Sequence, residues 1–206
     1  IEKFPGKRGI HTWASAITEM ALYADGVAIP DIYDVLSTQE GQDRAFAKLD
    51  TIKDHVVFWS SGAKPLDLIN SGEVSMSLAY NGRIGGAVLN DGADYVTVWD
   101  GQVLEEEWLV LMSGAPNRAA ALHFLVHASS TQAQADQAKW INYGPMRPSA
   151  LPIMEAGEPW FNTGVNIMEH MPNTDEHMKG GILADPDWWA DNGQAVNDRY
   201  AAWMAN

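Results

Sequence analysis

Tyr80 and Asn81 are the residues whose place in the sequence most directly indicates binding chemistry. In residues 74–80, apolar side chains alternate with small ones, and this period of two predicts a buried strand. Asn81 and Gly82 predict a turn directly after it, because both tolerate the left-handed backbone that turns require. Ligands of open α/β sheets bind at the carboxyl ends of the strands. Tyr80 and Asn81 are therefore candidate ligand contacts, and an ordinary core strand with an ordinary turn is the alternative.

Ser61 is a further candidate, because it follows another predicted strand. Residues 55–59 are a run of β-branched and aromatic residues, and Ser60-Ser61-Gly62 closes it. A serine at a strand end can donate a hydroxyl or backbone hydrogen bond to a ligand. An ordinary turn is the other explanation of the same residues.

Motifs for catalysis, metals and cofactors give no prediction of an active site. His123 and His127 have the i, i+4 spacing of helical metal ligands, yet no glutamate follows His123 and no third ligand is evident. Residues 82–86 are glycine-rich but lack the lysine of a phosphate-binding loop, and no Gly-x-Ser-x-Gly motif occurs. We therefore expect no catalytic residue, no metal site and no cofactor.

The composition is that of a folded acidic protein without cysteine. The 206 residues suffice for one large domain or two small lobes, and 46% hydrophobic residues with nine tryptophans provide a substantial core. The net charge of −14 argues against nucleic acid as a partner and suits a cationic ligand. Because cysteine is absent, disulfides and thiolate chemistry are excluded. No apolar run approaches the ~20 residues that span a bilayer.

Strand and helix patterns alternate in residues 1–102, which predicts βαβ units around a largely parallel sheet. These residues can make one complete α/β lobe. We expect Thr12 to cap the first helix and Thr38 to cap the third. The expected strands are residues 7–11, 55–59, 74–80 and 95–99, and the expected helices are residues 13–24, 32–36, 39–52 and 65–70.

Residues 103–206 have a mostly helical pattern. Residues 108–112 are the only predicted strand there, and a lone strand cannot complete a sheet. The chain begins Ile-Glu-Lys-Phe-Pro-Gly, which is not a signal peptide and is typical of an internal stretch of a longer protein. We therefore expect this half to need strands that the sequence does not contain. Its expected helices are residues 117–128, 131–141 and 194–204, with a rigid loop at residues 143–148.

Five segments, in order along the whole chain, carry a family resemblance. They are Phe4-Pro5-Gly6-Lys7-Arg8-Gly9, residues 41–49, Gly72-Glu73-Val74 with Tyr80-Asn81-Gly82, Tyr143-Gly144-Pro145, and residues 188–192 with Trp203. Together they resemble the periplasmic spermidine/putrescine-type solute-binding proteins of ABC importers. In that family, two α/β lobes close on the ligand like a hinged clamp, and one lobe is inserted within the other.

The resemblance implies an α/β fold of the type II periplasmic binding protein kind. Residues 1–102 would be the second, inserted lobe, and residues 103–206 would be the crossover and the C-terminal return of the first lobe, whose N-terminal part is lacking. The implied location is periplasmic and the implied partners are a membrane permease and a small cationic or amine-bearing solute such as a polyamine. The incomplete lobe implies self-association.

The resemblance also assigns residues to the ligand. The family's aromatic residue at the end of the second-lobe strand falls on Tyr80, and its acidic anchor for a ligand amine falls on Glu107. The aromatic residue two positions earlier is replaced by Glu105, and the acidic pair of polyamine binders falls near residues 12–16, where none is acidic. This departure weakens the case for a long polyamine. Tyr143 and Trp189 lie in regions that supply further cleft contacts in the family.

A carboxylate among aromatic faces suits an ammonium group. Charged hydrogen bonds contribute about 1.5–3 kcal/mol each, and cation–π contacts roughly 0.5–2 kcal/mol. Trp13, Trp59 and Trp189 therefore join Tyr80 and Glu107 as candidates, with the alternatives that the tryptophans are core residues and that residues 105–107 are a solvated hinge.

The expected function is that of the solute-binding component of an ABC importer. One alternative is an α/β enzyme acting on a small amine or sugar, which would require an acid–base pair in the cleft. Another is the effector-sensing lobe of a transcription regulator. The acidic composition argues against the regulator, because DNA-binding modules carry basic patches.

Overall fold

The computed structural model describes residues 2–156 and 164–205, and a three-stranded parallel sheet lies near its N-terminus. The strands are β1 (Arg8–His11), β2 (Val56–Trp59) and β3 (Met76–Ser77). β1 lies in the centre, and its last residue, His11, pairs with Trp59, the last residue of β2. The strands predicted at residues 7–11 and 55–59 are confirmed. Their carboxyl ends lie side by side at one edge of the sheet.

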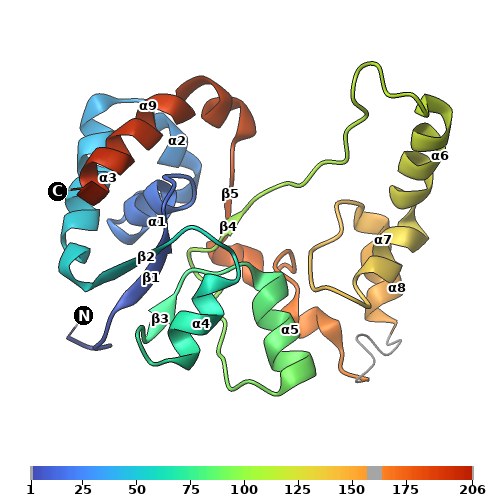
Figure 1. The fold of residues 1–206 in the computed structure, drawn as a ribbon, viewed down its shortest axis with the longest axis horizontal. Coiled ribbons are helices and arrows are strands. Elements are labelled where there is room, and N and C mark those ends of the chain that lie inside the picture. The colour runs from blue at the N-terminus through green and yellow to red at the C-terminus, as the bar shows by residue number, and fades with distance from the viewer. Residues whose placement is uncertain (1, 157–163, 206) are drawn as a thin grey trace.

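Four helices bury the main hydrophobic cluster with this sheet. They are α1 (Ile17–Ala24), α2 (Ile32–Leu36), α3 (Gln39–Asp50) and α9 (Pro186–Ala205). Figure 1 shows α9 beside α1, α2 and α3, although it ends the chain. Tyr200 of α9 is fully buried there, and its hydroxyl donates a 2.9 Å hydrogen bond to the His11 carbonyl. This packing brings together residues from both sides of the division expected between residues 102 and 103. The division itself stays a prediction.

The starts of α1 and α3 test the two predicted helix caps. Thr38 caps α3 as predicted, because its hydroxyl accepts a 3.0 Å hydrogen bond from the backbone N–H of Gly41. The cap predicted at Thr12 is wrong. The Thr12 N–H donates to the carbonyl of Trp59 at 3.0 Å and so continues the sheet pairing beyond β1. α1 begins later, after Ala16, whose φ of 65° lies in the left-handed region.

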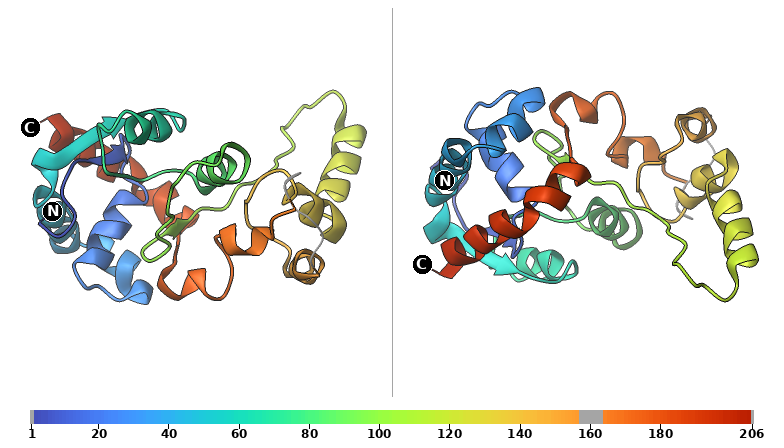
Figure 2. Two further views of the ribbon diagram at one scale, coloured as in Figure 1. Left: turned by 90° about the horizontal axis from the view of Figure 1, so that it is seen from below. Right: turned by 90° about the horizontal axis from the view of Figure 1, so that it is seen from above.

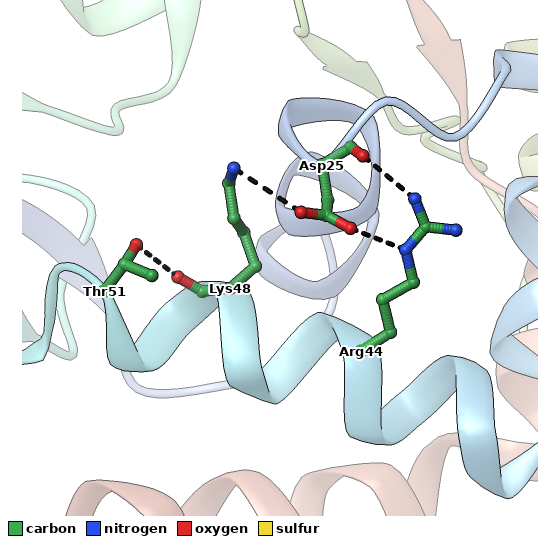
Figure 3. Close-up of polar contacts among 4 residues, drawn as sticks. All are labelled: Asp25, Arg44, Lys48 and Thr51. Atoms are coloured by element: carbon green, nitrogen blue, oxygen red, sulfur yellow. Dashed lines mark hydrogen bonds and ion pairs between the residues drawn. The ribbon is translucent and has the colours of Figure 1, made fainter.

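A charged contact joins the end of α1 to α3, as Figure 3 shows. The guanidinium Nε of Arg44 lies 2.5 Å from Asp25 Oδ2, and Lys48 Nζ lies 3.6 Å from Asp25 Oδ1. Arg44 also donates a 2.9 Å hydrogen bond to the Asp25 carbonyl at the carboxyl end of α1. The hydrogen bond from Arg44 lowers the pKa of the Asp25 carboxyl, so this carboxylate stays charged.

α5 (Asn81–Asp91) replaces the turn that Asn81 and Gly82 predict, and β3 is much shorter than the predicted strand at residues 74–80. The glycines of α5 have close neighbours. A Cβ on Gly82 would lie 2.7 Å from the Tyr143 ring, and one on Gly85 would lie 2.3 Å from Asn142 Oδ1. The turn prediction is wrong because these glycines allow close packing rather than a left-handed backbone.

A second, two-stranded sheet is formed by β4 (Val103–Leu104) and β5 (Ile182–Leu183), which pair in parallel. The strands predicted at residues 95–99 and 108–112 are wrong. A strand requires a hydrogen-bonded neighbour, and none of residues 2–156 and 164–205 pairs with either segment. Both segments leave apolar side chains in solvent, with Val98 76% and Trp108 61% exposed.

The end of the molecule opposite α1–α3 is helical, as both views in Figure 2 show. Its helices α7 and α8 enclose a small hydrophobic cluster centred on Met154 and Met171. The expected helix at residues 117–128 forms but has no buried residue, and the one expected at residues 131–141 ends at Gln137. The elements not yet given are α4 (Lys64–Asn70), α6 (Arg118–Ala128), α7 (Thr131–Gln137), α8 (Leu151–Glu155) and 3-10 helices at Ile29–Asp31, Lys53–His55, Pro148–Ala150, Ile167–His170 and His177–Gly180. No helix within the described residues has both the length and the apolar character needed to cross a membrane.

His11 is a buried histidine at the carboxyl end of β1. It is 4% exposed, and its ring stacks on Trp13 with ring centroids 4.0 Å apart. Its Nδ1 has no hydrogen-bond partner within the part of the chain that the structure describes. Because burial disfavours the charged form, the pKa of His11 is lowered from 6.5 to about 4. His11 is therefore a neutral imidazole in the folded protein at pH 7.

We expect the free energy of unfolding to fall as the pH is lowered from 6.5 towards about 4, because the unfolded chain takes up a proton that folded His11 does not. A shift of this size corresponds to roughly 3 kcal/mol. Urea denaturation of wild type and His11→Phe across this range measures the effect, with exposed His55→Gln as the control. A pH dependence that is identical in all three proteins contradicts the prediction.

We also expect the 206-residue chain to self-associate, because exposed apolar patches and unpaired segments favour association. Trp108→Ser combined with Val110→Ser should reduce association, whereas Trp140→Ser, which removes an exposed ring that does not line the cavity bordered by Trp108, should not. Light scattering over a range of concentrations measures this, and a strictly monomeric wild type would contradict it. The exposed apolar side chains in question are Val96, Val98, Trp108, Leu109, Val110, Met112, Phe124 and Val126.

Candidate functional site

Four aromatic rings meet where β1, β2 and β3 lead into loops. Trp59 lies edge-on to His11 at 5.4 Å, to Trp13 at 5.5 Å and to Tyr80 at 6.4 Å between ring centroids. Trp59 is 3% exposed, whereas Tyr80 is 40% exposed. The structure therefore brings three predicted site residues together, and Tyr80 is the most exposed ring of this cluster.

Trp59 also carries a buried donor that has no partner among the described residues. Its indole Nε1 is inaccessible to solvent and makes no hydrogen bond to any described residue. Buried polar groups are nearly always hydrogen-bonded, so an unsatisfied one requires an explanation. Trp59 is thus a buried core residue, and its indole N–H is a candidate hydrogen-bond donor.

Asn81 and Tyr143 lie beside Tyr80 at the start of α5. Asn81 Nδ2 donates a 2.5 Å hydrogen bond to the carbonyl of Asn142, which precedes Tyr143. The Tyr143 ring packs over Gly82, and no Cβ would fit between them. The side-chain amide of Asn81 therefore holds the 142–143 segment against α5. Ser61 is an exposed residue next to Gly62, where a Cβ would lie 3.0 Å from the Tyr80 ring.

Glu105 and Glu107 are acidic groups whose charges act on Tyr80. Desolvation is the largest cause that raises the pKa of the Tyr80 hydroxyl, and the charges of Glu105 and Glu107 are the next largest. Desolvation, and to a smaller extent the charge of Glu107, also raises the pKa of Glu105, whose Oε1 accepts a 3.4 Å hydrogen bond from Ser15. The resemblance assigned Glu107 and treated Glu105 as a lost aromatic. Both carboxylates act electrostatically on the Tyr80 hydroxyl, and both residues line the same cavity as Tyr80.

Residues 105–107 line two cavities. The larger has a volume of about 2050 Å³ and is also lined by Tyr80, Asn81 and Tyr143. The smaller has a volume of about 490 Å³ and includes Trp189 in its wall. Trp189 is therefore near the acidic run but lines a different cavity from Tyr80. Neither of these two cavities is lined by Trp13, Trp59 or Ser61.

Glu19 is a buried carboxylate that the sequence analysis missed. It accepts hydrogen bonds from Trp189 Nε1 at 2.8 Å, from the Tyr33 hydroxyl at 2.9 Å and from Thr18 at 3.0 Å. Burial raises its pKa, which the three hydrogen bonds partly oppose. Glu19 therefore fixes the Trp189 indole on α9, and that indole N–H is not available to a ligand. A lone glutamate in a helix pattern gives no sequence signal of such a contact.

Among the described residues, no group of three or more histidine, aspartate or glutamate side chains could hold a metal ion. His123 and His127 lie on α6 and are exposed. The arrangement around Tyr80 offers aromatic faces, carboxylates and static hydrogen bonds, which are the groups that bind a cation.

Comparison with known proteins connects this geometry to a family. The model for bacterial extracellular solute-binding proteins matches residues 1–169. The gamma-aminobutyric acid-binding protein of Pseudomonas aeruginosa is 37% identical over 205 residues, which are 100% of this chain and 55% of that protein.

Solved structures agree. The Atu4243-GABA receptor is 32% identical with a TM-score of 0.77, over 100% of this chain and 59% of that one. The PBP MotA from A. tumefaciens B6 in complex with glucopine is 29% identical with a TM-score of 0.78, over 98% and 61%. An ABC transporter substrate-binding protein from Bradyrhizobium japonicum USDA 110 is 33% identical with a TM-score of 0.78, over 98% and 60%.

The chain spans a little more than half the length of these relatives. The predicted α/β fold of a periplasmic binding protein is confirmed by the likeness, with the chain corresponding to part of that fold. The chain belongs to the bacterial extracellular solute-binding protein family.

Proposed function

We propose that this chain is the ligand-binding part of a periplasmic solute-binding protein that delivers a small amine-bearing solute to an ABC-type permease. The observation that carries the proposal is the exposed ring of Tyr80 in the wall of a cavity that Glu105 and Glu107 also line. An ammonium group there would contact an aromatic face and two carboxylates. The net charge of −14 adds a long-range attraction for cations.

The relatives support this class of ligand but give no support to a polyamine. The ligands that their names mention are gamma-aminobutyric acid and glucopine. The loop of residues 12–16 offers no carboxylate for a second ammonium group. We therefore favour a solute with one amine, and the quoted relatives, which are binding proteins, favour a binder over the alternative α/β enzyme.

The chain corresponds in this proposal to one lobe and the crossover of a two-lobed clamp. In it, residues 1–102 form one lobe, whose main hydrophobic cluster also contains Tyr200 and Trp203 of α9, and residues 103–206 form the crossover and the return of the other lobe. The exposed apolar side chains of the 95–112 segment and of α6 fit a surface that the rest of the clamp would cover. Ligand contacts from both lobes would then favour the closed state.

Glu107→Gln tests the anchor for the amine. We expect the dissociation constant for gamma-aminobutyric acid to rise by about 10- to 100-fold, because a charge-assisted hydrogen bond worth about 1.5–3 kcal/mol is lost. Glu106→Gln is the matched control, since it removes the same charge from a neighbour that is not among the causes of the Tyr80 pKa shift. Calorimetric titration measures both, and equal affinities in the two variants would remove Glu107 from the site.

Tyr80 variants separate stacking from a structural role. Tyr80→Phe and Tyr80→Trp should retain most of the affinity, because each keeps an aromatic face, whereas Tyr80→Ala should weaken binding by about 3- to 30-fold. The melting temperature of Tyr80→Ala should change little, because the side chain is 40% exposed. Trp59→Phe serves as a core control. A strongly destabilised Tyr80→Ala whose folded fraction binds normally would show that Tyr80 is only a core residue.

A further inference from the structure

Glu19 is a fully buried carboxyl group of α1 that no cation of the described chain pairs with. Its Oε1 lies 2.8 Å from the indole Nε1 of Trp189 and 2.9 Å from the hydroxyl oxygen of Tyr33. Its Oε2 lies 3.0 Å from the hydroxyl oxygen of Thr18. Among the described residues, Tyr33 is the titratable side chain that acts on the pKa of Glu19, and no charged group on α1, α2, α3 or α9 does so.

The two oxygens of Glu19 have different partners. The Tyr33 hydroxyl accepts a 2.9 Å hydrogen bond from the backbone N–H of Asp185, and its own hydrogen bonds to Glu19 Oε1. The indole N–H of Trp189 can only donate, and it donates to the same oxygen. Two donors suit the carbonyl oxygen of a carboxylic acid, which has two lone pairs, and this leaves Oε2 as the oxygen that can carry a hydrogen.

Thr18 distinguishes a carboxylate from a carboxylic acid at Oε2. Its hydroxyl oxygen lies 3.2 Å from the carbonyl of Ala14 and 3.0 Å from Glu19 Oε2. Because a hydroxyl has one hydrogen, Thr18 can donate to only one of these two acceptors when Glu19 is ionised. When Glu19 is protonated, Oε2–H donates to Thr18 and Thr18 donates to Ala14, so both contacts are hydrogen bonds. The oxygen positions are the same in both cases.

Burial also favours the neutral form of Glu19. An ionised carboxylate without a nearby cation is costly in a protein interior, and such a group usually keeps its proton. Desolvation accordingly raises the pKa of Glu19, and the hydrogen bonds that it accepts oppose this only in part.

We propose that Glu19 keeps its proton in the folded protein at neutral pH and that this neutral carboxyl group positions the start of α9. Glu19 binds Trp189 of α9 directly. Through the Tyr33 hydroxyl it also holds the backbone N–H of Asp185, the residue before α9. One carboxyl group thus connects α1 and α2 to the point where the chain enters its last helix.

This point adjoins the two-stranded sheet of β4 and β5. Ala184, which follows β5, donates a 2.9 Å hydrogen bond to the carbonyl of Leu104 at the end of β4. The acidic run of residues 105–107 begins directly after Leu104. The Glu19 proton therefore supports the segment that leads into this run, and ionisation of Glu19 would weaken that support.

Glu19→Gln tests the proton, because glutamine has the shape of a protonated glutamate and can make the same hydrogen bonds. At neutral pH we expect Glu19→Gln to unfold at the same urea concentration as wild type or at a higher one. The infrared carbonyl band of a protonated carboxylic acid should be weaker in Glu19→Gln than in wild type. Glu73→Gln, at an exposed position, is the matched control and should keep the band.

The pH profile separates a proton from a merely structural role. A carboxyl group whose pKa is raised by folding contributes its full stability below its unfolded value of 4.5 and loses it as the pH rises through the folded pKa. The unfolding constant of wild type relative to Glu19→Gln should therefore increase by up to about tenfold per pH unit above 4.5. Glu73→Gln should show no such trend.

Glu19→Leu tests the positioning role, because leucine has a similar size but accepts no hydrogen bond. We expect hydrogen exchange at the Trp189 indole N–H and at the Asp185 backbone N–H to become roughly 10- to 100-fold faster, whereas Glu19→Gln should exchange as wild type does. Nuclear magnetic resonance measures both rates, and Trp189→Phe identifies the indole signal. The indole N–H of Trp203, which donates to Asp50, is the internal reference.

Four results would overturn the proposal. The first is a wild-type infrared band no stronger than that of Glu19→Gln, and the second is a Glu19→Gln that is destabilised as much as Glu19→Leu. The third is a ratio of unfolding constants that does not change with pH. The fourth is a Glu19→Leu in which exchange at Trp189 and Asp185 is no faster than in wild type.

Discussion

The parallel pairing of β1 with β2 is the constraint on which the candidate site depends. Because parallel strands end at the same edge of a sheet, the pairing of His11 with Trp59 fixes where both loops begin. Trp13 follows one strand and Ser61 follows the other, while Tyr80 arrives three residues after β3. The aromatic cluster is therefore a direct consequence of strand register. A shift of one residue would turn each of these side chains to the opposite face.

α9 supports this edge of the sheet through hydrogen bonds to the end of β1 and the loop after it. Asn197 accepts a 2.8 Å hydrogen bond from the backbone of Ala14, and Tyr200 bonds to the carbonyl of His11. Trp189 is tied to Glu19 of α1. The last helix of the chain thus fixes the loop that follows its first strand. This long-range support also explains how Ala16 keeps a left-handed backbone, which costs about 1–2 kcal/mol and persists only when neighbours determine it.

The sequence correctly predicted the elements whose formation depends on neighbouring residues in the chain. The β-branched run before Trp59 and the Thr38 cap were both readable from the sequence. Residues 95–99 have a strand pattern too, but a strand needs a partner that the described residues do not supply. Gly82 and Gly85 resemble turn residues, yet their neighbours Tyr143 and Asn142 lie some 60 positions away. Tyr80 became a candidate through its place after a predicted strand and Glu107 through family resemblance, whereas Glu19 depends on contacts that no spacing reveals.

The size of the larger cavity relates ligand charge to closure. Its volume of about 2050 Å³ exceeds the roughly 300–1000 Å³ of ordinary ligand pockets, so a small solute would leave most of it to water. In the proposed clamp, the opposing lobe would displace that water, and the lower dielectric would strengthen every charge pair at Tyr80. The same desolvation penalises any charge without a partner. A ligand whose charges are all paired therefore favours the closed state, and one with an unpaired charge opposes it. In the proposed clamp, selectivity and closure would in this way be a single equilibrium.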